Sequence, residues 1–144
     1  MSDLPAVLVV DDDASTLGLL VAVLKHLGLK PRTAGNGHEA LAIMASEEPA
    51  AVILDLLMPG MDGFEVLRQL SARAPHMLRR VIVVTAAIGH RVDECQELLQ
   101  VWSLFRKPMD IDQLAASLIA CLAATVNDGA TAAQRSISCI SADE

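Results

Sequence analysis

The stretch AVILDLLMPGMDGFEVL, from Ala51 to Leu67, decides the fold of this chain. Its first four residues are apolar, as expected of a strand that is buried on both faces. Asp55 ends that run, and Met58-Pro59-Gly60 further on has the composition of a turn. Asp62 and Glu65 then have the spacing of a capping box, which marks the start of a helix. A buried strand, a carboxylate at its end and a helix beyond it are typical of an α/β protein.

The same unit recurs along the chain, because short apolar or β-branched runs alternate with longer amphipathic segments. This alternation predicts a doubly wound sheet of five parallel strands with five helices on its two faces. The second and fifth strands are more polar than the others, so we expect them at the edges of the sheet. The strands are predicted at Ala6–Val10, Pro31–Ala34, Ala51–Leu54, Arg80–Thr85 and Val101–Phe105.

Apolar residues at helical spacing, together with capping residues, place the helices between these strands. Gly28 is expected to end the first helix. A single domain is expected over residues 1–124, and the Ser-rich segment 125–144, which lacks a sustained period, is expected to be a flexible polar tail. The helices are predicted at Leu17–Leu27, at His38–Ser46, from Asp62 through Leu70, at Val92–Leu99, and from Asp110 through Leu122.

The composition argues against several classes of protein. The chain has 144 residues, 53% of them hydrophobic, and a formal net charge of −7. This acidic balance argues against direct contact with nucleic acid or with an anionic membrane, because both need clustered Lys and Arg. The apolar run Ala6–Val10 is too short for a signal peptide or a membrane span. The three cysteines form no Cys-x-x-Cys pair, which favours a reducing cytoplasmic location over a disulfide framework.

Polar and charged side chains stand at the carboxyl ends of the predicted strands, where open parallel sheets bind ligands. Asp11-Asp12-Asp13 follows the first strand, Asp55 follows the third, Thr85 ends the fourth and Lys107 follows the fifth. Clustered carboxylates repel one another unless a cation lies among them. Hard oxygen ligands of this kind suit Mg²⁺, and a carboxylate can itself be the nucleophile toward a phosphoryl group.

Four motifs at these strand ends resemble those of a known family, the receiver domains of two-component response regulators. The resemblance covers about Leu4 to Ala124 and implies the flavodoxin-like receiver fold. The motif that starts at Asp55, Asp-x-x-Met-Pro-x-Met-Asp-Gly, is highly specific, and the other three follow in the expected order. The motifs are VLVVDDD at Val7–Asp13, VILDLLMPGMDG at Val52–Gly63, VIVVTA at Val81–Ala86 and FRKP at Phe105–Pro108.

The resemblance implies a phosphoacceptor and a magnesium site. Asp55 would be the residue that is phosphorylated. Asp11 and Asp12 would hold Mg²⁺, with Asp12 the more direct ligand, alongside Asp55 and the backbone carbonyl of Leu57. Asp13 is given no role in the site, because the dipole at a helix N-terminus accounts for an acidic residue there.

The resemblance also implies how the site responds to phosphorylation. Thr85 would bind a phosphoryl oxygen and act as the switch, while Lys107 would pair with the phosphoryl group or, in its absence, with Asp55. The bond between Lys107 and Pro108 is expected to be cis. Leu104 departs from the family pattern, which has Tyr or Phe at this switch position. Leucine cannot reproduce the movement of an aromatic ring. The output face, which the fourth helix, the fifth strand and the fifth helix would form, is therefore expected to signal differently.

The sequence therefore predicts a phosphoacceptor module rather than an enzyme, with self-catalysed phosphoryl transfer and slow autodephosphorylation as its chemistry. Slow loss of phosphate is expected because Leu57 and Ala87 are apolar where fast members of the family often carry polar side chains. The expected phosphoryl donor is a sensor histidine kinase or a histidine phosphotransfer protein. The downstream protein target of this chain is unknown, and the sequence leaves open whether the chain forms a homodimer through the fifth helix.

Two alternative functions also stay open from the sequence. One is a Mg²⁺-dependent phosphohydrolase with an aspartyl phosphate intermediate, which would need an acid-base carboxylate where Leu57 stands. The other is a degenerate receiver that serves only as a scaffold, which the leucine at position 104 leaves open.

Overall fold

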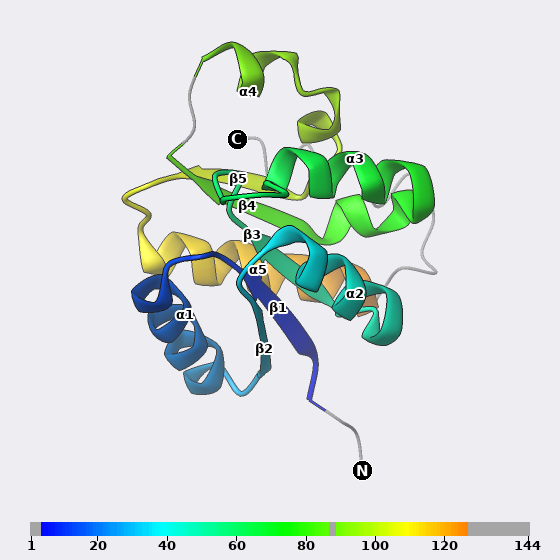
Figure 1. Cartoon of the computed structure of the whole chain (residues 1–144). Coiled ribbons are helices and arrows are strands. Elements are labelled where there is room, and N and C mark those ends of the chain that lie inside the picture. Colours follow the sequence, from blue (N-terminus) through cyan, green and yellow to red (C-terminus); the bar gives the residue numbers. More distant parts are fainter. Residues whose placement is uncertain (1–3, 87–88, 127–144) are drawn as a thin grey trace.

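A computed structural model of the chain describes residues 4–86 and 89–126. It contains a central sheet of five parallel strands in the order β2-β1-β3-β4-β5, with helices on both faces (Figure 1). This order belongs to the flavodoxin-like fold that the resemblance implies, and the two more polar strands, β2 and β5, lie at the edges as predicted. The strands are β1 (Ala6–Val10), β2 (Lys30–Ala34), β3 (Ala51–Leu54), β4 (Val81–Thr85) and β5 (Ser103–Arg106).

Helices connect the strands and cover both faces of the sheet (Figure 1). α1 and α5 pack on one face, while α2 and α3 pack on the other, with α4 on the α3 side. The described helices are α1 (Ala14–His26), α2 (Gly37–Glu47), α3 (Gly63–Arg73), α4 (His90–Glu94) and α5 (Ile111–Val126), with 3₁₀-helices η1 (Pro75–Arg80) and η2 (Gln96–Leu99).

The inner strands are continuously apolar because both of their faces are buried. Successive side chains of a strand point to opposite faces of the sheet. Leu8 and Val52 accordingly belong to the core cluster under α2 and α3. Val7 and Ile53 belong to the second cluster, under α1 and α5. Every residue of β3 and β4 is buried, so packing on both faces holds the two strands that carry Asp55 and Thr85 at the carboxyl edge of the sheet.

Polar side chains cap the N-termini of α1 and α3, and of these two caps the sequence predicted that of α3. The Asp13 carboxylate accepts hydrogen bonds from the Thr16 amide at 3.0 Å and from the Thr16 hydroxyl at 2.7 Å. Asp62 accepts one from the Glu65 amide at 3.0 Å and so caps α3. Gly28, which follows α1, has a φ of 77°, a left-handed conformation that suits glycine at this position.

The prediction of a fourth helix over Val92–Leu99 was wrong, because the segment is broken in two. α4 ends at Glu94, Cys95 is extended, and the following turn is the 3₁₀-helix η2. Val92, Cys95 and Leu98 all pack against the core cluster under α3. These side chains recur every third residue, a spacing that stays on one face of a 3₁₀-helix but drifts around the axis of an α-helix. The break thus keeps all three on the core side.

The remaining differences lie at element boundaries. β5 begins at Ser103 rather than Val101, and Arg80 belongs to η1 rather than to β4. The sequence predicts Thr125 and Val126 in the tail, but they form the end of α5. The rest of the predicted tail, residues 127–144, lies outside the described residues, so the domain boundary stays a prediction. Among the helices of the described ranges, none has the length and apolar character needed to cross a membrane.

Candidate functional site

Four strands deliver their polar residues to one edge of the sheet. Asp11 follows β1, Asp55 follows β3, Thr85 ends β4 and Lys107 follows β5. Backbone hydrogen bonds fix these positions, since the Asp55 amide donates to the Val10 carbonyl at 2.9 Å and the Lys107 amide donates to the Thr85 carbonyl at 3.0 Å. The parallel pairing of the strands is thus what gathers residues from distant parts of the sequence.

Lys107 connects the two buried carboxylates of the site. Its Nζ lies 3.1 Å from Asp11 Oδ2 and 3.2 Å from Asp55 Oδ2. The two aspartates are only 3% and 5% exposed, whereas the lysine side chain keeps 28% exposure. The peptide bond between Lys107 and Pro108 is cis, as the sequence predicted. One ammonium group therefore compensates two carboxylates that are almost out of contact with water.

The pKa values of Asp55 and Lys107 reflect opposing effects of burial and of neighbouring charges. Burial raises the pKa of Asp55, and the negative charge of Asp11 adds to the rise. The Leu57 amide, which donates to Asp55 Oδ1 at 3.1 Å, and the Lys107 ammonium oppose it. Burial alone would lower the pKa of Lys107, but its hydrogen bond to Asp11 and the charges of both aspartates raise it above its usual value.

Asp12 adds a third carboxylate to this edge. One oxygen from each of Asp11, Asp12 and Asp55 lies within 4.8 Å of the others, and Asp12 itself is exposed to solvent. Three carboxylates face one ammonium, so the cluster carries uncompensated negative charge. A small cation that prefers carboxylate oxygens and retains several waters fits this donor set, which is the chemistry of Mg²⁺. The Leu57 carbonyl, the remaining predicted ligand, belongs to the loop directly after Asp55.

The two predicted switch residues lie on neighbouring strands. Thr85 is fully buried at the end of β4. Leu104 in β5 pairs with Val83, and Arg106 pairs with Thr85. Because side chains alternate along a strand, Leu104 and Thr85 belong to the same face of the sheet, where Leu104 is half-buried against the core cluster under α3. Their roles as switch residues stay predictions.

The sequence alone did not reveal one contact next to this site. Asp62 was assigned only the cap of α3, but its Oδ2 also pairs with Arg91 Nη2 at 2.6 Å. The Arg91 guanidinium lies over the Phe64 ring, 4.2 Å from its centroid. This pairing holds the pKa of Asp62 below its usual value although burial alone would raise it. No local pattern indicates the pair, because 29 residues separate its members.

Comparison with known proteins places this chain in a family. The family model described as "Response regulator receiver domain" matches residues 7–119. Sporulation initiation phosphotransferase F of Bacillus subtilis is 37% identical over 110 residues, which cover 75% of this chain and 86% of that protein. The CheY-like receiver domain structure from Methanospirillum hungatei covers 88% of this chain and 99% of that one, with a TM-score of 0.78 at 23% identity, and it supports the fold.

Other relatives are much longer than this chain. The DNA-binding transcriptional regulator NtrC of Salmonella typhimurium is 38% identical over 110 residues, which cover 75% of this chain but only 23% of that protein. The matched segment is thus under a quarter of that regulator.

Proposed function

The chain belongs to the family of response regulator receiver domains of two-component signalling, and from this premise we propose that Asp55 is its phosphoacceptor. The observation that carries the proposal is the contact of Lys107 Nζ with Asp55 Oδ2 at 3.2 Å, beside the carboxylates of Asp11 and Asp12. The Asp55 carboxylate, which is the proposed nucleophile, therefore lies beside the Lys107 ammonium and beside two further carboxylates that could bind a metal ion with it. Neither alternative function is favoured by the comparisons. The leucine at position 57 also leaves a hydrolase without its second carboxylate.

Phosphoryl transfer at this site would proceed by direct displacement. An Asp55 carboxylate oxygen attacks phosphorus, so that a new P–O bond forms while the P–N bond of a phosphohistidine breaks and the imidazole nitrogen leaves with the bonding electrons. Lys107 shifts from the carboxylates to a phosphoryl oxygen, and the Thr85 hydroxyl donates to another. Asp11, Asp12, Asp55 and the Leu57 carbonyl would hold Mg²⁺, which when bound supplies positive charge to the phosphoryl oxygens.

The proposed donor is the phosphohistidine of a sensor histidine kinase or of a histidine phosphotransfer protein in the cytoplasm. The proposed output is a change in contacts with a downstream protein. Thr85 would link phosphorylation to this output. Its movement toward the acyl phosphate would displace the segment that leads to α4 and would bias an equilibrium between two conformations of the chain.

A small acyl phosphate tests the proposal without a kinase. The purified chain is incubated with acetyl phosphate, in MgCl₂ or in excess EDTA, and its intact mass is measured. We expect one added phosphoryl group with Mg²⁺ and little or none with EDTA, because the carboxylate cluster repels the anionic donor unless a cation is bound. Equal uptake in both conditions, or no uptake in either, would overturn the proposal.

The acyl phosphate is expected to persist for minutes to hours rather than seconds. Leu57 carries a side chain that is 45% exposed and cannot orient a water for attack on the phosphoryl group. Ala87, the other apolar position in this argument, lies outside the described residues. After removal of the donor, intact mass is followed over time for the natural chain and for Leu57→Asn, which we expect to lose its phosphoryl group faster. Decay of the natural chain within seconds would contradict this prediction.

A further inference from the structure

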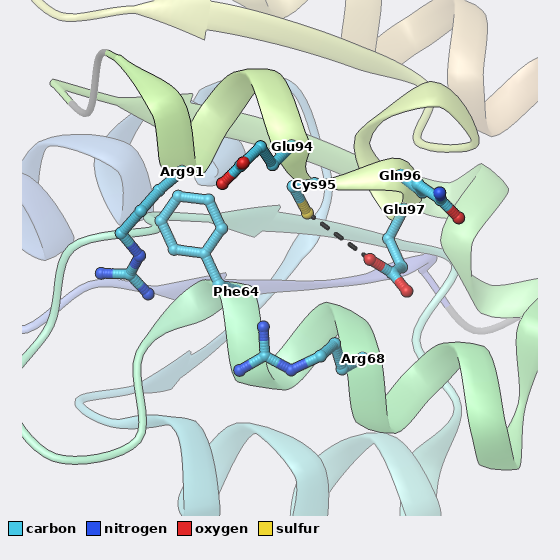
Figure 2. A pocket seen from close by; sticks show the side chains of 7 residues that line it. All are labelled: Phe64, Arg68, Arg91, Glu94, Cys95, Gln96 and Glu97. Carbon is cyan, nitrogen blue, oxygen red and sulfur yellow. Dashed lines mark hydrogen bonds between the residues drawn. The ribbon is translucent and has the colours of Figure 1, made fainter.

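Arg91 joins α4 to the start of α3 through two kinds of contact. Its guanidinium pairs with Asp62, the N-cap of α3, at 2.6 Å. It also covers the ring of Phe64 in the first turn of that helix, at 4.2 Å from the ring centroid. Figure 2 shows Arg91 beside Phe64, reaching from α4 toward α3. The Arg91 side chain is 58% exposed, so these contacts form at the surface and can be broken at small cost.

The described contacts of α4 are otherwise few. The helix has five residues, begins after Gly89 at a φ of 91°, and has no side-chain cap. None of its described side chains is fully buried, and η2 buries none of its own. Val92 contacts the core cluster only as a partly buried residue. A helix this short gains little stability from its own hydrogen bonds and depends on its anchors.

An open crevice of about 310 Å³ separates α4 and η2 from α3. Phe64, Arg91 and Cys95 line it, as does a second arginine, Arg68 (Figure 2). Arg68 differs from Arg91 because its partner, Glu65, lies on its own helix. The crevice gives α4 room to change its distance from α3, and Arg91, which lines the crevice, also pairs with the N-cap of α3.

Both residues of the Arg91–Asp62 contact are connected through the chain to the acidic site. Asp62 ends the loop that starts at Asp55, and this loop is fixed by the Gly63 amide, which donates to the Leu56 carbonyl at 3.0 Å. Arg91 follows the segment that leaves Thr85, at the end of β4. The contact thus bridges the loop of the proposed phosphoacceptor and the segment of the proposed switch.

We propose that Arg91 is a latch that holds α4 against α3 in the unphosphorylated chain and opposes the change that phosphorylation favours. The mechanism rests on the proposed function, because it assigns to phosphorylation the displacement of the segment after Thr85. Movement of α4 away from α3 breaks the pair with Asp62 and uncovers Phe64. Loss of the latch must therefore favour the phosphorylated conformation, since coupling between two equilibria is reciprocal.

The equilibrium test uses beryllofluoride, a non-covalent mimic of the phosphoryl group, with Mg²⁺ and the full chain. Binding is followed by the shifts of backbone amide signals in NMR spectra. Arg91→Ala is expected to bind beryllofluoride roughly two- to fivefold more tightly than the natural chain, the size expected for one exposed ion pair with a cation–π contact. Arg68→Ala, which removes the same charge from the same crevice, is the matched control and is expected to bind as the natural chain does.

A second variant isolates the pair from other effects of losing the arginine. Asp62→Asn keeps the cap of α3, because Asn is as good a cap as Asp, but it removes the charge that Arg91 contacts. It is expected to show part or all of the gain of Arg91→Ala, and the double variant is expected to gain no more than Arg91→Ala alone. Independent, additive gains would overturn the latch.

Hydrogen exchange in the chain without beryllofluoride tests the latch separately from the proposed function. Amides of residues 91–99 are expected to exchange roughly two- to fivefold faster in Arg91→Ala, and at the natural rate in Arg68→Ala. Unchanged exchange, or equal binding of beryllofluoride by Arg91→Ala and the natural chain, would overturn the latch. If the natural chain does not bind beryllofluoride at all, the proposed function fails, while the exchange result still decides whether Arg91 holds α4.

Discussion

Asp55→Asn is expected to take up no phosphoryl group from acetyl phosphate, whereas Asp13→Asn is expected to take up one, as the natural chain does. The asparagine amide keeps the size of the carboxylate and can still accept the hydrogen bond from the Leu57 amide. It has no anionic oxygen to attack phosphorus, so the loss of reactivity is complete while the local packing is retained.

Asp13 makes a matched control because it is an acidic neighbour of the site with a separate structural task. Its carboxylate caps α1 by accepting hydrogen bonds from Thr16, and asparagine can serve as the same cap. Its backbone amide, which donates to Asp11 Oδ1 at 2.9 Å, is unaffected by the substitution. Intact mass and peptide mapping after borohydride reduction give the result. A phosphoryl group found on Asp55→Asn, at any carboxylate, would contradict Asp55 as the phosphoacceptor.

Gly63→Ala is expected to destabilise the fold by about 1–3 kcal/mol and to impair phosphoryl uptake as well. A Cβ at position 63 would lie 2.4 Å from the Asp55 carbonyl oxygen and 2.6 Å from the Leu56 Cα. Both atoms are backbone, so the chain must move, and the hydrogen bond from the Gly63 amide to the Leu56 carbonyl is strained with it. Because Asp55 is part of the displaced backbone, its carboxylate shifts relative to Lys107.

Gly18→Ala is expected to change the stability of the fold in the opposite direction and serves as the control. Gly18 lies within α1 and is exposed, and a methyl group there would meet no atom within 4 Å beyond its chain neighbours and the backbone of its own helix. Alanine is expected to stabilise the chain by about 0.5–1 kcal/mol, because glycine loses more backbone entropy in a helix interior. Urea denaturation measures both variants. A Gly63→Ala protein as stable as the natural chain would show that the loop after Asp55 is not tightly packed.

The sheet was predictable because its signals are local. Continuous apolar runs marked the strands, and β1 and β3 were predicted with the bounds that the structure has. Caps such as Asp62 and the glycine after α1 act over three or four residues, so they too can be recognised in the sequence. The prediction of the fourth helix was wrong because a period of 3.0 in the apolar residues cannot be distinguished from one of 3.6 over about eight residues.

The site was predictable in part. The resemblance assigned Asp55, Asp11, Asp12 and Lys107, and the structure brings these four side chains to one edge, although their roles in phosphorylation and metal binding stay predictions. It did not indicate that Lys107 would contact Asp11 as closely as Asp55. That choice depends on the register of four strands, which no single segment contains.

By itself the sequence determined the strand segments, the sheet's fold class and the identity of the residues at its carboxyl edge, because each depends on neighbours within a few positions. Only the tertiary structure decided which charges meet. Lys107 reaches carboxylates 96 and 52 residues earlier in the chain, and Arg91 reaches Asp62 across 29 residues. Pairs of this kind exist because parallel crossovers return distant segments to one edge, and their geometry is a property of the packed sheet rather than of any local stretch.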